Sequence, residues 1–388
     1  MKFFSILSLF LISVIAASAQ GKYQIQGHVK GLPDSTVIFL MEDDGSALIP
    51  IARDTCFNGA FSFQGKTNGK EAQGLELYIP GDAFPMRLNV WVASNSIVKI
   101  FGNNNFLKTW RVESNIKEQK ETNRFIQASF VNLEKLQEVL VAQRQLSAKR
   151  RKASDVEKIK LKNEMAVLST TRDSLQMLII KKDLEVLQQS PVSNIWLSRL
   201  KSIAIDVRQN KTGLREPAVQ LLSRLSPEQK ESQIGREIIH FLFPATAVKT
   251  GEPMADADLY DLGGTLRKLE DYKGKYLLLD FWSRGCGPCM MAMPELGEFS
   301  ETNKDKLTVI SLSLDTKKEI WKKISEQQKI SWVNLSDGKG MAGIAAKYGV
   351  EAIPHYVMIS PEGKVLGSWV GYEKGLLARK FAEYAKGN

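Results

Sequence analysis

Residues 276–289 read Tyr276-Leu277-Leu278-Leu279-Asp280-Phe281-Trp282-Ser283-Arg284-Gly285-Cys286-Gly287-Pro288-Cys289. The apolar run up to Trp282 predicts a buried strand, and the residues from Cys286 to Ser300 predict a helix. A helix start presents unpaired N–H groups and a partial positive charge, which together stabilise a thiolate on Cys286. Pro288 suits this place because the first turn of a helix needs no N–H donor from it. Two thiols at i and i+3 lie on the same face and can form a disulfide.

Redox chemistry is therefore the favoured interpretation of the cysteine pair. Cys286, expected at an exposed tip, is the predicted nucleophile, and Cys289, one turn further on, is the predicted resolving thiol. A purely structural disulfide would close too small a ring to remove much chain entropy. A zinc site needs four ligands, but the third cysteine, Cys56, is distant in sequence and the histidines are scattered at 28, 240 and 355. Chance spacing is the remaining alternative.

Strand-like and helix-like segments alternate from Pro244 onward, which predicts an α/β domain over residues 244–388 with a largely covered sheet. The expected elements after the cysteine helix are strands at 308–314, 356–359 and 364–370 and helices at 317–328 and 376–386.

This region resembles known redox domains in several separate motifs. Leu279 to Cys289 resembles the active-site segment of thioredoxin-fold proteins, and Pro294 resembles their helix-kinking proline. Gly349-Val350-Glu351-Ala352-Ile353-Pro354 resembles the segment that carries their cis-proline. The stretches 264–266 and 269–275 and the extra helical segment between 314 and 349 are similar to the TlpA/ResA branch. That branch comprises extracytoplasmic thiol–disulfide oxidoreductases within the AhpC/TSA superfamily.

The resemblance implies roles for further residues. It implies a cis Ile353–Pro354 bond facing the cysteines, and a buried acid, Asp280, that can take the proton from Cys289. A hydrogen-bonded core carboxyl without a kinetic role is the alternative for Asp280. It also implies that no cofactor or metal is needed beyond the redox-active disulfide. Substrate contacts are expected from Trp282, Gly287, Pro288, Ile353 and His355, although His355 could equally be a plain strand-end residue.

The sequence departs from the family at three positions. Gly285 stands where the family usually has Trp, which removes an aromatic side chain beside the nucleophile. Ser311 stands where thioredoxin has a lysine paired with the buried acid, so the acidity of Asp280 is expected to be set differently. Met290 replaces the usual basic residue after the second cysteine, which weakens thiolate stabilisation slightly.

The first nineteen residues have the pattern of a secretory signal: Lys2, an apolar run from Phe3 to Ala17, and small residues before a cleavage site after Ala19. An uncleaved anchor is the alternative, but the run is shorter than a membrane-spanning helix requires. The mature chain is therefore expected in the periplasm.

Residues 20–112 show short alternating runs separated by Gly, Pro, Asn and Asp, which predicts an antiparallel sheet or sandwich. Cys56 is expected on a strand over residues 54–63, as a buried free thiol. A redox role for Cys56 is the weaker alternative.

Residues 113–243 are poor in Gly and Pro and predict an all-helical segment. One helix is expected over 116–146, with the basic residues 148–152 in the turn that follows. The next helix has an apolar face built from Leu161, Leu168 and Leu175 with Met165 and Ile179. A β-rich domain followed by such helices resembles multidomain thioredoxin-like proteins common in Bacteroidetes.

The net charge of +10 belongs mostly to this helical segment, which has 23 basic and 16 acidic residues, a surplus of seven. These charges mostly alternate in sign, as on a solvated helix face. The single basic run has no interleaved aromatic residues for base stacking, so nucleic acid is not an expected partner.

The function we predict is reduction of disulfides in other secreted proteins, such as apocytochrome c. Gly-Pro between the cysteines matches thioredoxin, a reductant at about −270 mV. An oxidising compartment then requires a membrane thiol-electron donor. A partner-binding or redox-sensing assembly protein, with the helical segment as a candidate homodimer element, is the alternative. A thiol peroxidase is a weaker one, because Leu279 occupies the Pro position and Ser283 the Thr position of the peroxidatic motif.

Overall fold

The computed structural model describes residues 21–43, 47–67, 69, 71–81, 83–208 and 213–385. Its internal contacts divide the chain into two compact units: Met1–Leu40 with Ala52–Asn123, and Met41–Ile51 with Arg124–Asn388. The predicted signal segment lies outside the described residues. Among the described residues, no helix combines the length and the apolar character needed to cross a membrane.

The N-terminal part of the chain forms two four-stranded sheets. One has the order β4 (Ala60–Lys66), β1 (Lys22–Val29), β7 (Ile97–Gly102) and β8 (Arg111–Glu113). The other has the order β3 (Leu48–Thr55), β2 (Val37–Asp43), β5 (Gln73–Tyr78) and β6 (Leu88–Val92). A short 3-10 helix, η1 (Leu107–Thr109), precedes β8.

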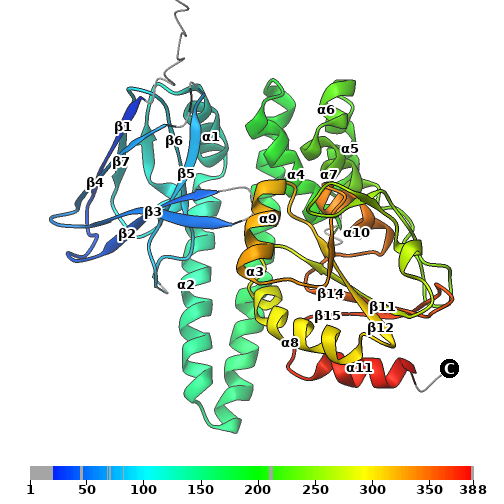
Figure 1. Cartoon of the computed structure of the whole chain (residues 1–388). Helices are drawn as coiled ribbons and strands as arrows, with labels where there is room; N and C mark the ends of the chain where they lie inside the picture. Colours follow the sequence, from blue (N-terminus) through cyan, green and yellow to red (C-terminus); the bar gives the residue numbers. More distant parts are fainter. Residues whose placement is uncertain are drawn as a thin grey trace, which may run out of the picture. The chain divides into compact units, whose positions relative to one another are not determined.

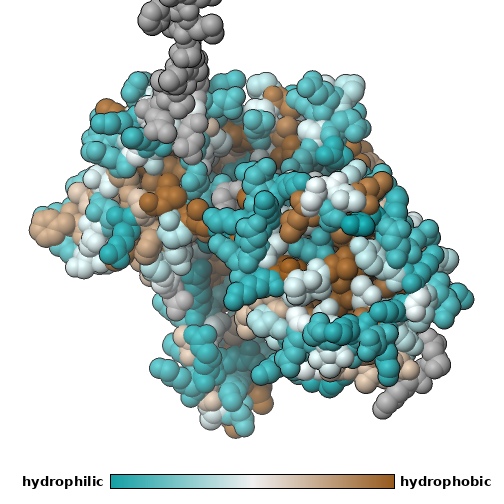
Figure 2. All heavy atoms as spheres, in the orientation of Figure 1, coloured by the Kyte–Doolittle hydropathy of each residue, from teal (hydrophilic) through white to brown (hydrophobic). Residues whose placement is uncertain are grey.

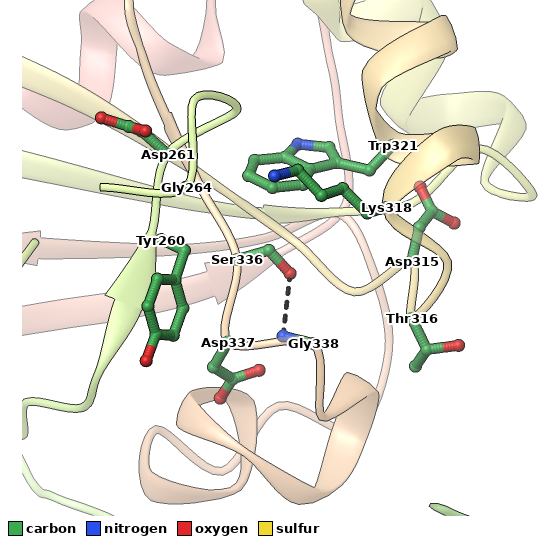
Figure 3. A pocket seen from close by; sticks show the side chains of 10 residues that line it. All are labelled: Tyr260, Asp261, Gly264, Asp315, Thr316, Lys318, Trp321, Ser336, Asp337 and Gly338. Carbon is green, nitrogen blue, oxygen red and sulfur yellow. Dashed lines mark hydrogen bonds between the residues drawn. The ribbon is translucent and has the colours of Figure 1, made fainter. Parts of the chain in front are cut away.

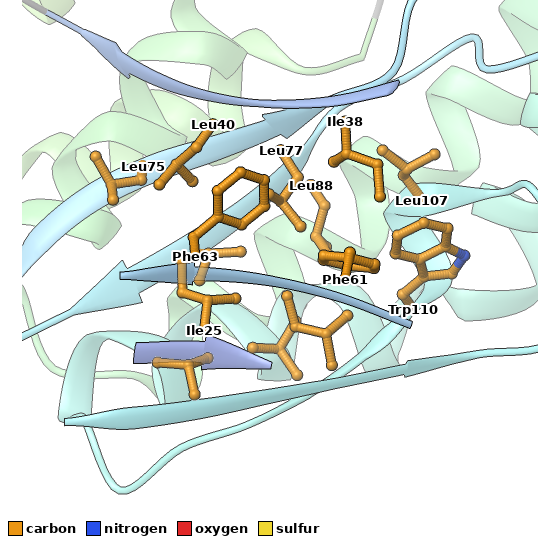
Figure 4. Packing of buried hydrophobic residues seen from close by; sticks show 14 of the residues in the cluster. Ile25, Ile38, Leu40, Phe61, Phe63, Leu75, Leu77, Leu88, Leu107 and Trp110 are labelled. Carbon is orange, nitrogen blue, oxygen red and sulfur yellow. The ribbon is translucent and has the colours of Figure 1, made fainter. Parts of the chain in front are cut away.

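The inward-facing residues of both sheets share one core, so the predicted β domain is confirmed as a sandwich (Figure 4). Ile25 and Phe63 from the first sheet meet Leu40 and Leu77 from the second. The pairs β1–β4, β5–β6 and β7–β8 are antiparallel, but β1 pairs with β7 in parallel. The chain reaches β7 from β6 of the other sheet rather than by a hairpin from β1, which permits the parallel pairing.

Cys56 lies after β3 rather than within a strand, which corrects the predicted strand over 54–63. Asn58 and Gly59 both have positive φ, at 49° and 74°, which is the backbone of a tight hairpin turn. This turn separates β3 from β4 and leaves Cys56 in the connection, 1% exposed and not part of a disulfide. Its prediction as a buried free thiol is confirmed.

Helices α1 to α7 follow in the described part of the chain, and the two longest form a hairpin (Figure 1). Their bounds are α1 (Lys117–Ala128), α2 (Phe130–Lys152), α3 (Asp155–Gln189), α4 (Asn194–Arg208), α5 (Arg215–Leu222), α6 (Pro227–Glu231) and α7 (Gln233–Leu242). Leu161 and Leu175 are buried on α3, and the residues between them in the same apolar column are half-buried. The predicted apolar face of α3 is therefore confirmed.

Two details of the helical prediction were wrong. The helix expected over 116–146 is divided at Ser129, where no Gly or Pro marks a break, and its second part runs on to Lys152. The basic run 148–152 lies in the last turns of α2 rather than in the loop. At this end of a helix, cations interact favourably with the helix dipole. Ser154 caps α3 by accepting from the N–H of Glu157. Figure 2 shows mostly hydrophilic residues, with some hydrophobic ones among them, around this end of the α2–α3 hairpin.

The C-terminal part contains a five-stranded sheet in the order β13 (Val333–Leu335), β12 (Leu307–Ser313), β11 (Tyr276–Trp282), β14 (His355–Ile359) and β15 (Val365–Val370). The strands β11, β12 and β13 are parallel, and β14 and β15 are antiparallel to their neighbours. Its helices are α8 (Gly287–Asn303), α9 (Lys318–Gln327), α10 (Ile344–Lys347) and α11 (Leu376–Ala385). The small elements are β9 (Leu259–Tyr260), β10 (Leu266–Arg267), η2 (Leu269–Tyr272) and η3 (Gly340–Ala342). This is the predicted thioredoxin fold.

Each face of this sheet has its own core. Leu278 and Trp282 of β11 pack with side chains from α8, α9 and α11. Leu277, Leu279 and Phe281 point the other way, toward α10 and the segment before the sheet. This alternation places Asp280 on the α8 face, between Leu278 and Trp282.

The helices α4 and α7 contact the thioredoxin-like part within the second unit. Arg208 at the end of α4 pairs with Glu351 at 2.6 Å, two residues before Ile353. Gln233 of α7 donates to the hydroxyl of Thr316 at 3.1 Å. The helical segment is therefore joined directly to the loop that precedes Pro354.

Candidate active site

The cysteine pair lies where β11 turns into α8. Cys286 is the N-cap of α8, Pro288 stands in the first turn, and Pro294 lies inside the helix. Cys286 and Cys289 form a disulfide, with their Cα atoms 5.2 Å apart. The four residues Ser283–Cys286 are the whole connection between strand and helix, and the last of them is the N-cap.

A backbone hydrogen bond singles out the first sulfur. The N–H of Cys289 donates to Sγ of Cys286 at 3.1 Å. In the reduced protein the same donor, with the helix dipole, stabilises a thiolate at Cys286. The arrangement therefore favours Cys286 as the ionised, attacking thiol.

The expectation that Cys286 stands at an exposed tip was wrong. Its side chain is only 8% exposed, and Cys289 is 1% exposed, because both pack into the core under α8. The exposed neighbours are Gly285, Gly287 and Pro288. An attacking disulfide must therefore approach over these small residues.

Asp280 lies on the same face of the sheet as both cysteines and is 1% exposed. Burial raises its pKa to about 7, and the hydrogen bond from Ser311 acts in the opposite direction. Ser311 Oγ donates to Oδ2 of Asp280 at 2.8 Å, and Trp332 Nε1 donates to Ser311 Oγ at 2.9 Å. Near neutral pH this carboxyl can exist in either protonation state, as a proton acceptor in thiol chemistry must.

The loop before β14 completes the site. The Ile353–Pro354 peptide bond is cis, as the resemblance implied. Ile353 is half-buried and packs against the core that contains both cysteines. Glu351 and Ala352, just before it, are exposed.

Two residues expected to contact substrate are placed elsewhere. Trp282 is fully buried beneath α8, because its position on β11 points it into the core. His355 is 7% exposed, and its ring meets Phe281 edge-on at 6.1 Å on the opposite face of the sheet from the cysteines. Neither side chain presents a surface to a protein substrate at the disulfide.

A cavity of about 240 Å³ lies at the carboxyl ends of β12 and β13 (Figure 3). Asp315, which the sequence motifs did not predict as a site residue, is 5% exposed at its edge. Its carboxylate accepts from the backbone N–H of Arg284, in the loop before Cys286, at 3.1 Å. Burial raises the pKa of Asp315, while the N–H of Arg284 lowers it. A polar residue directly after a buried strand was the available signal for this position.

A disulfide at a helix start, a buried carboxyl beneath it and a neighbouring cis-proline loop, all in a thioredoxin fold, define the class of thioredoxin-like thiol–disulfide oxidoreductases. Residues 250–367, which lie within this thioredoxin-like part of the chain, match the AhpC/TSA family.

Known proteins similar to this domain include the thioredoxin-like protein YneN of Bacillus subtilis, 28% identical over 127 residues. That match covers 32% of this chain and 73% of YneN. The thiol-disulfide oxidoreductase ResA of Geobacillus thermodenitrificans is 29% identical over 127 residues, covering 32% of this chain and 72% of ResA.

Among solved structures, the thioredoxin domain of a thiol-disulfide oxidoreductase from Bacteroides vulgatus is 30% identical. The match has a TM-score of 0.32 and covers 35% of this chain and 99% of that one. A thiol:disulfide interchange protein from Bacteroides sp. is 28% identical, with a TM-score of 0.33, over 36% of this chain and 91% of that one.

Proposed function

We propose that this chain is a periplasmic dithiol reductase of disulfides in other exported proteins. The observation that carries the proposal is the hydrogen bond from the Cys289 N–H to Cys286 Sγ, at the start of a seventeen-residue helix. It favours a nucleophilic thiolate at Cys286 when the pair is reduced. The predicted signal segment and the extracytoplasmic branch that the sequence resembles support the location.

The reaction has two exchange steps. The Cys286 thiolate attacks one sulfur of the substrate disulfide, whose S–S bond breaks while a mixed disulfide forms, and the leaving thiolate takes a proton from water. Cys289 then loses its proton to Asp280 and attacks Cys286 Sγ. The mixed disulfide breaks, the second substrate thiolate leaves and is protonated, and Cys286–Cys289 becomes oxidised. Two electrons pass to the substrate, so a membrane thiol-electron donor must reduce the pair again.

Small exposed residues beside Cys286 suit a protein substrate. Gly285, Gly287 and Pro288 leave the approach to the sulfur open, and Glu351 to Ile353 form the opposite rim in this proposal. Apocytochrome c, which presents a disulfide in an unfolded chain, is one candidate substrate.

Equilibration of the full mature chain with glutathione buffers tests the direction of the reaction. We expect a reduction potential nearer to about −270 mV than to about −120 mV. A strongly oxidising value would contradict reductase activity and favour an oxidase. Insulin reduction with dithiothreitol should be lost in Cys286→Ser and retained in Cys56→Ala.

Trapping with Cys289→Ser tests the assignment of roles and identifies the substrate. The variant cannot resolve the mixed disulfide, so substrates should accumulate on Cys286 in periplasmic extracts. Cys286→Ser is the matched control and should trap nothing. Equal trapping on Cys286→Ser would contradict the assignment.

A further inference from the structure

Three polar residues form a row across the sheet beneath the active-site helix. Asp280 on β11 lies opposite Ser311 on β12 and opposite Tyr356 on β14. All three are at most 1% exposed. Ser311 bonds both Asp280 and Trp332, whereas the hydroxyl of Tyr356 has no hydrogen-bond partner among the described residues.

The hydroxyl of Ser311 can donate one hydrogen bond, and the contact with Trp332 determines which atom accepts it. An indole N–H can only donate, so at 2.9 Å it occupies one acceptor site on Ser311 Oγ. The hydroxyl proton is then directed to Oδ2 of Asp280, at 2.8 Å. A proton placed on Oδ2 would point at Ser311 and force the hydroxyl proton out of this bond.

The other carboxyl oxygen has a different environment. Oδ1 of Asp280 is buried and has no hydrogen-bond partner among the described residues. It can gain a proton without displacing any donor, whereas Oδ2 cannot. The two oxygens of one carboxyl are thus made chemically unequal by a contact from Trp332, 52 residues further along the chain.

We propose that Ser311 and Trp332 are positioning residues that hold Oδ2 as an acceptor and leave Oδ1 as the oxygen that exchanges a proton with Cys289. The inference rests on the proposed function for the identity of the proton donor. In the resolving step the proton moves from Cys289 Sγ to Oδ1, and Asp280 later releases it to solvent. Ser311 keeps its own proton throughout.

The network also sets the pH at which Asp280 ionises. The Ser311 hydroxyl stabilises the carboxylate against the cost of burial, so its loss should make ionisation harder. Without the Trp332 N–H, the hydroxyl can turn and accept from a protonated Oδ2, which should have the same effect to a smaller extent. Among the described residues, the titratable groups on this face are Tyr276 of β11, Tyr356 of β14, Tyr384 of α11, Tyr372 in the loop before it, Cys286 at the N-cap of α8, and Cys289 and Glu295 of α8.

The direct test is a titration of Asp280 by carboxyl carbon-13 NMR in the oxidised full chain, with Asp280→Asn to assign the signal. We expect the midpoint to rise by about one pH unit in Ser311→Ala and by less in Trp332→Phe. Ser311→Thr keeps the hydroxyl and should keep the midpoint. Trp321→Phe is the matched control, because this buried indole donates instead to Asn334 at 3.1 Å. An unchanged or lowered midpoint in Ser311→Ala would overturn the proposal.

Infrared spectroscopy tests which oxygen carries the proton. With the proton on Oδ1, the carbonyl oxygen is Oδ2 and accepts from Ser311, so Ser311→Ala should move the C=O band of protonated Asp280 to higher wavenumber. An unmoved band would mean that the proton sits on Oδ2, and the proposal fails. Neither measurement uses substrate, so a chain that titrates as expected but traps no mixed disulfide would refute the proposed function alone.

Discussion

The backbone N–H of Arg284 lies 3.1 Å from Oδ2 of Asp315, and this bond holds the loop that leads into Cys286. Asp315 also interacts with Ser313 Oγ at 3.3 Å. The carboxylate thus ties the end of β12 to the connection between β11 and α8. Its position on the loop, rather than at the sulfur, makes it a positioning residue.

Asp315→Ala should therefore loosen the start of α8. It removes the bond from the half-buried Arg284 N–H to the Asp315 carboxylate, at a cost of roughly 1 kcal/mol in the free energy of unfolding. A less ordered N-cap should also stabilise the Cys286 thiolate less well, which iodoacetamide alkylation would report as slower reaction near neutrality. Asp261→Ala is the control, because Asp261 lines the same cavity but bonds Thr265 and Arg267. A stability loss with unchanged alkylation would contradict the positioning role.

Asp280 should make the protein less stable as pH rises. Its pKa is about 7 in the folded chain and about 4 when unfolded, so between these values only the folded state binds the proton. Stability should fall by about 1.4 kcal/mol per pH unit in that window and level off above it. Denaturant unfolding at pH 5 and pH 8 checks this slope. Asp280→Asn should flatten the profile and be more stable than the native chain at pH 8, while resolving mixed disulfides more slowly.

Cys56 should be chemically silent in the native protein. Its side chain is buried, and burial raises the pKa of its thiol, so little thiolate forms and reagents have poor access. Mass spectrometry after brief alkylation of the reduced chain should show modification of Cys286 with Cys56 untouched. Rapid modification of Cys56 under native conditions would show that the sandwich core opens there.

Arg224 should be a main source of stability in the helical segment. Its guanidinium donates to the carbonyls of Leu187, Gln188 and Ser190 at the end of α3, at 2.6, 3.2 and 2.7 Å, and it lies over the Trp196 ring. Arg224→Ala should cost about 2–3 kcal/mol in the free energy of unfolding, because it removes charged hydrogen bonds to helix-end carbonyls. Arg172→Ala, which removes an exposed ion pair, should cost less than about 1 kcal/mol. Equal losses in the two variants would refute the capping role.

Much of the redox domain could be predicted because its signals are local. The Cys286-Gly287-Pro288-Cys289 spacing and the apolar run before it placed a strand and a helix to within a few residues. The cis bond at Pro354 was implied by the resemblance and is present.

The remaining features depend on contacts that no local pattern encodes. A continuous apolar run such as β11 does not reveal which side chains face α8, so the buried position of Trp282 could not be foreseen. The partnership of Trp332 with Ser311 arises only when β12 and the residue before β13 meet in the folded sheet. The break between α1 and α2 has no Gly or Pro to mark it and reflects packing instead.

The alternation along β11 has a consequence for protein engineering. Leu279, Asp280 and Phe281 point to opposite faces of the sheet in turn. Deleting Phe281 would therefore place the Asp280 side chain on the face opposite to Trp282 and the two cysteines. A graft of Cys286–Cys289 onto another scaffold therefore has to reproduce both the motif and the alternation of the strand before it, so that the acid faces the same side as the cysteines. The connection between the strand and the helix can change in length only where the acid and the cysteines still lie on the same face of the sheet.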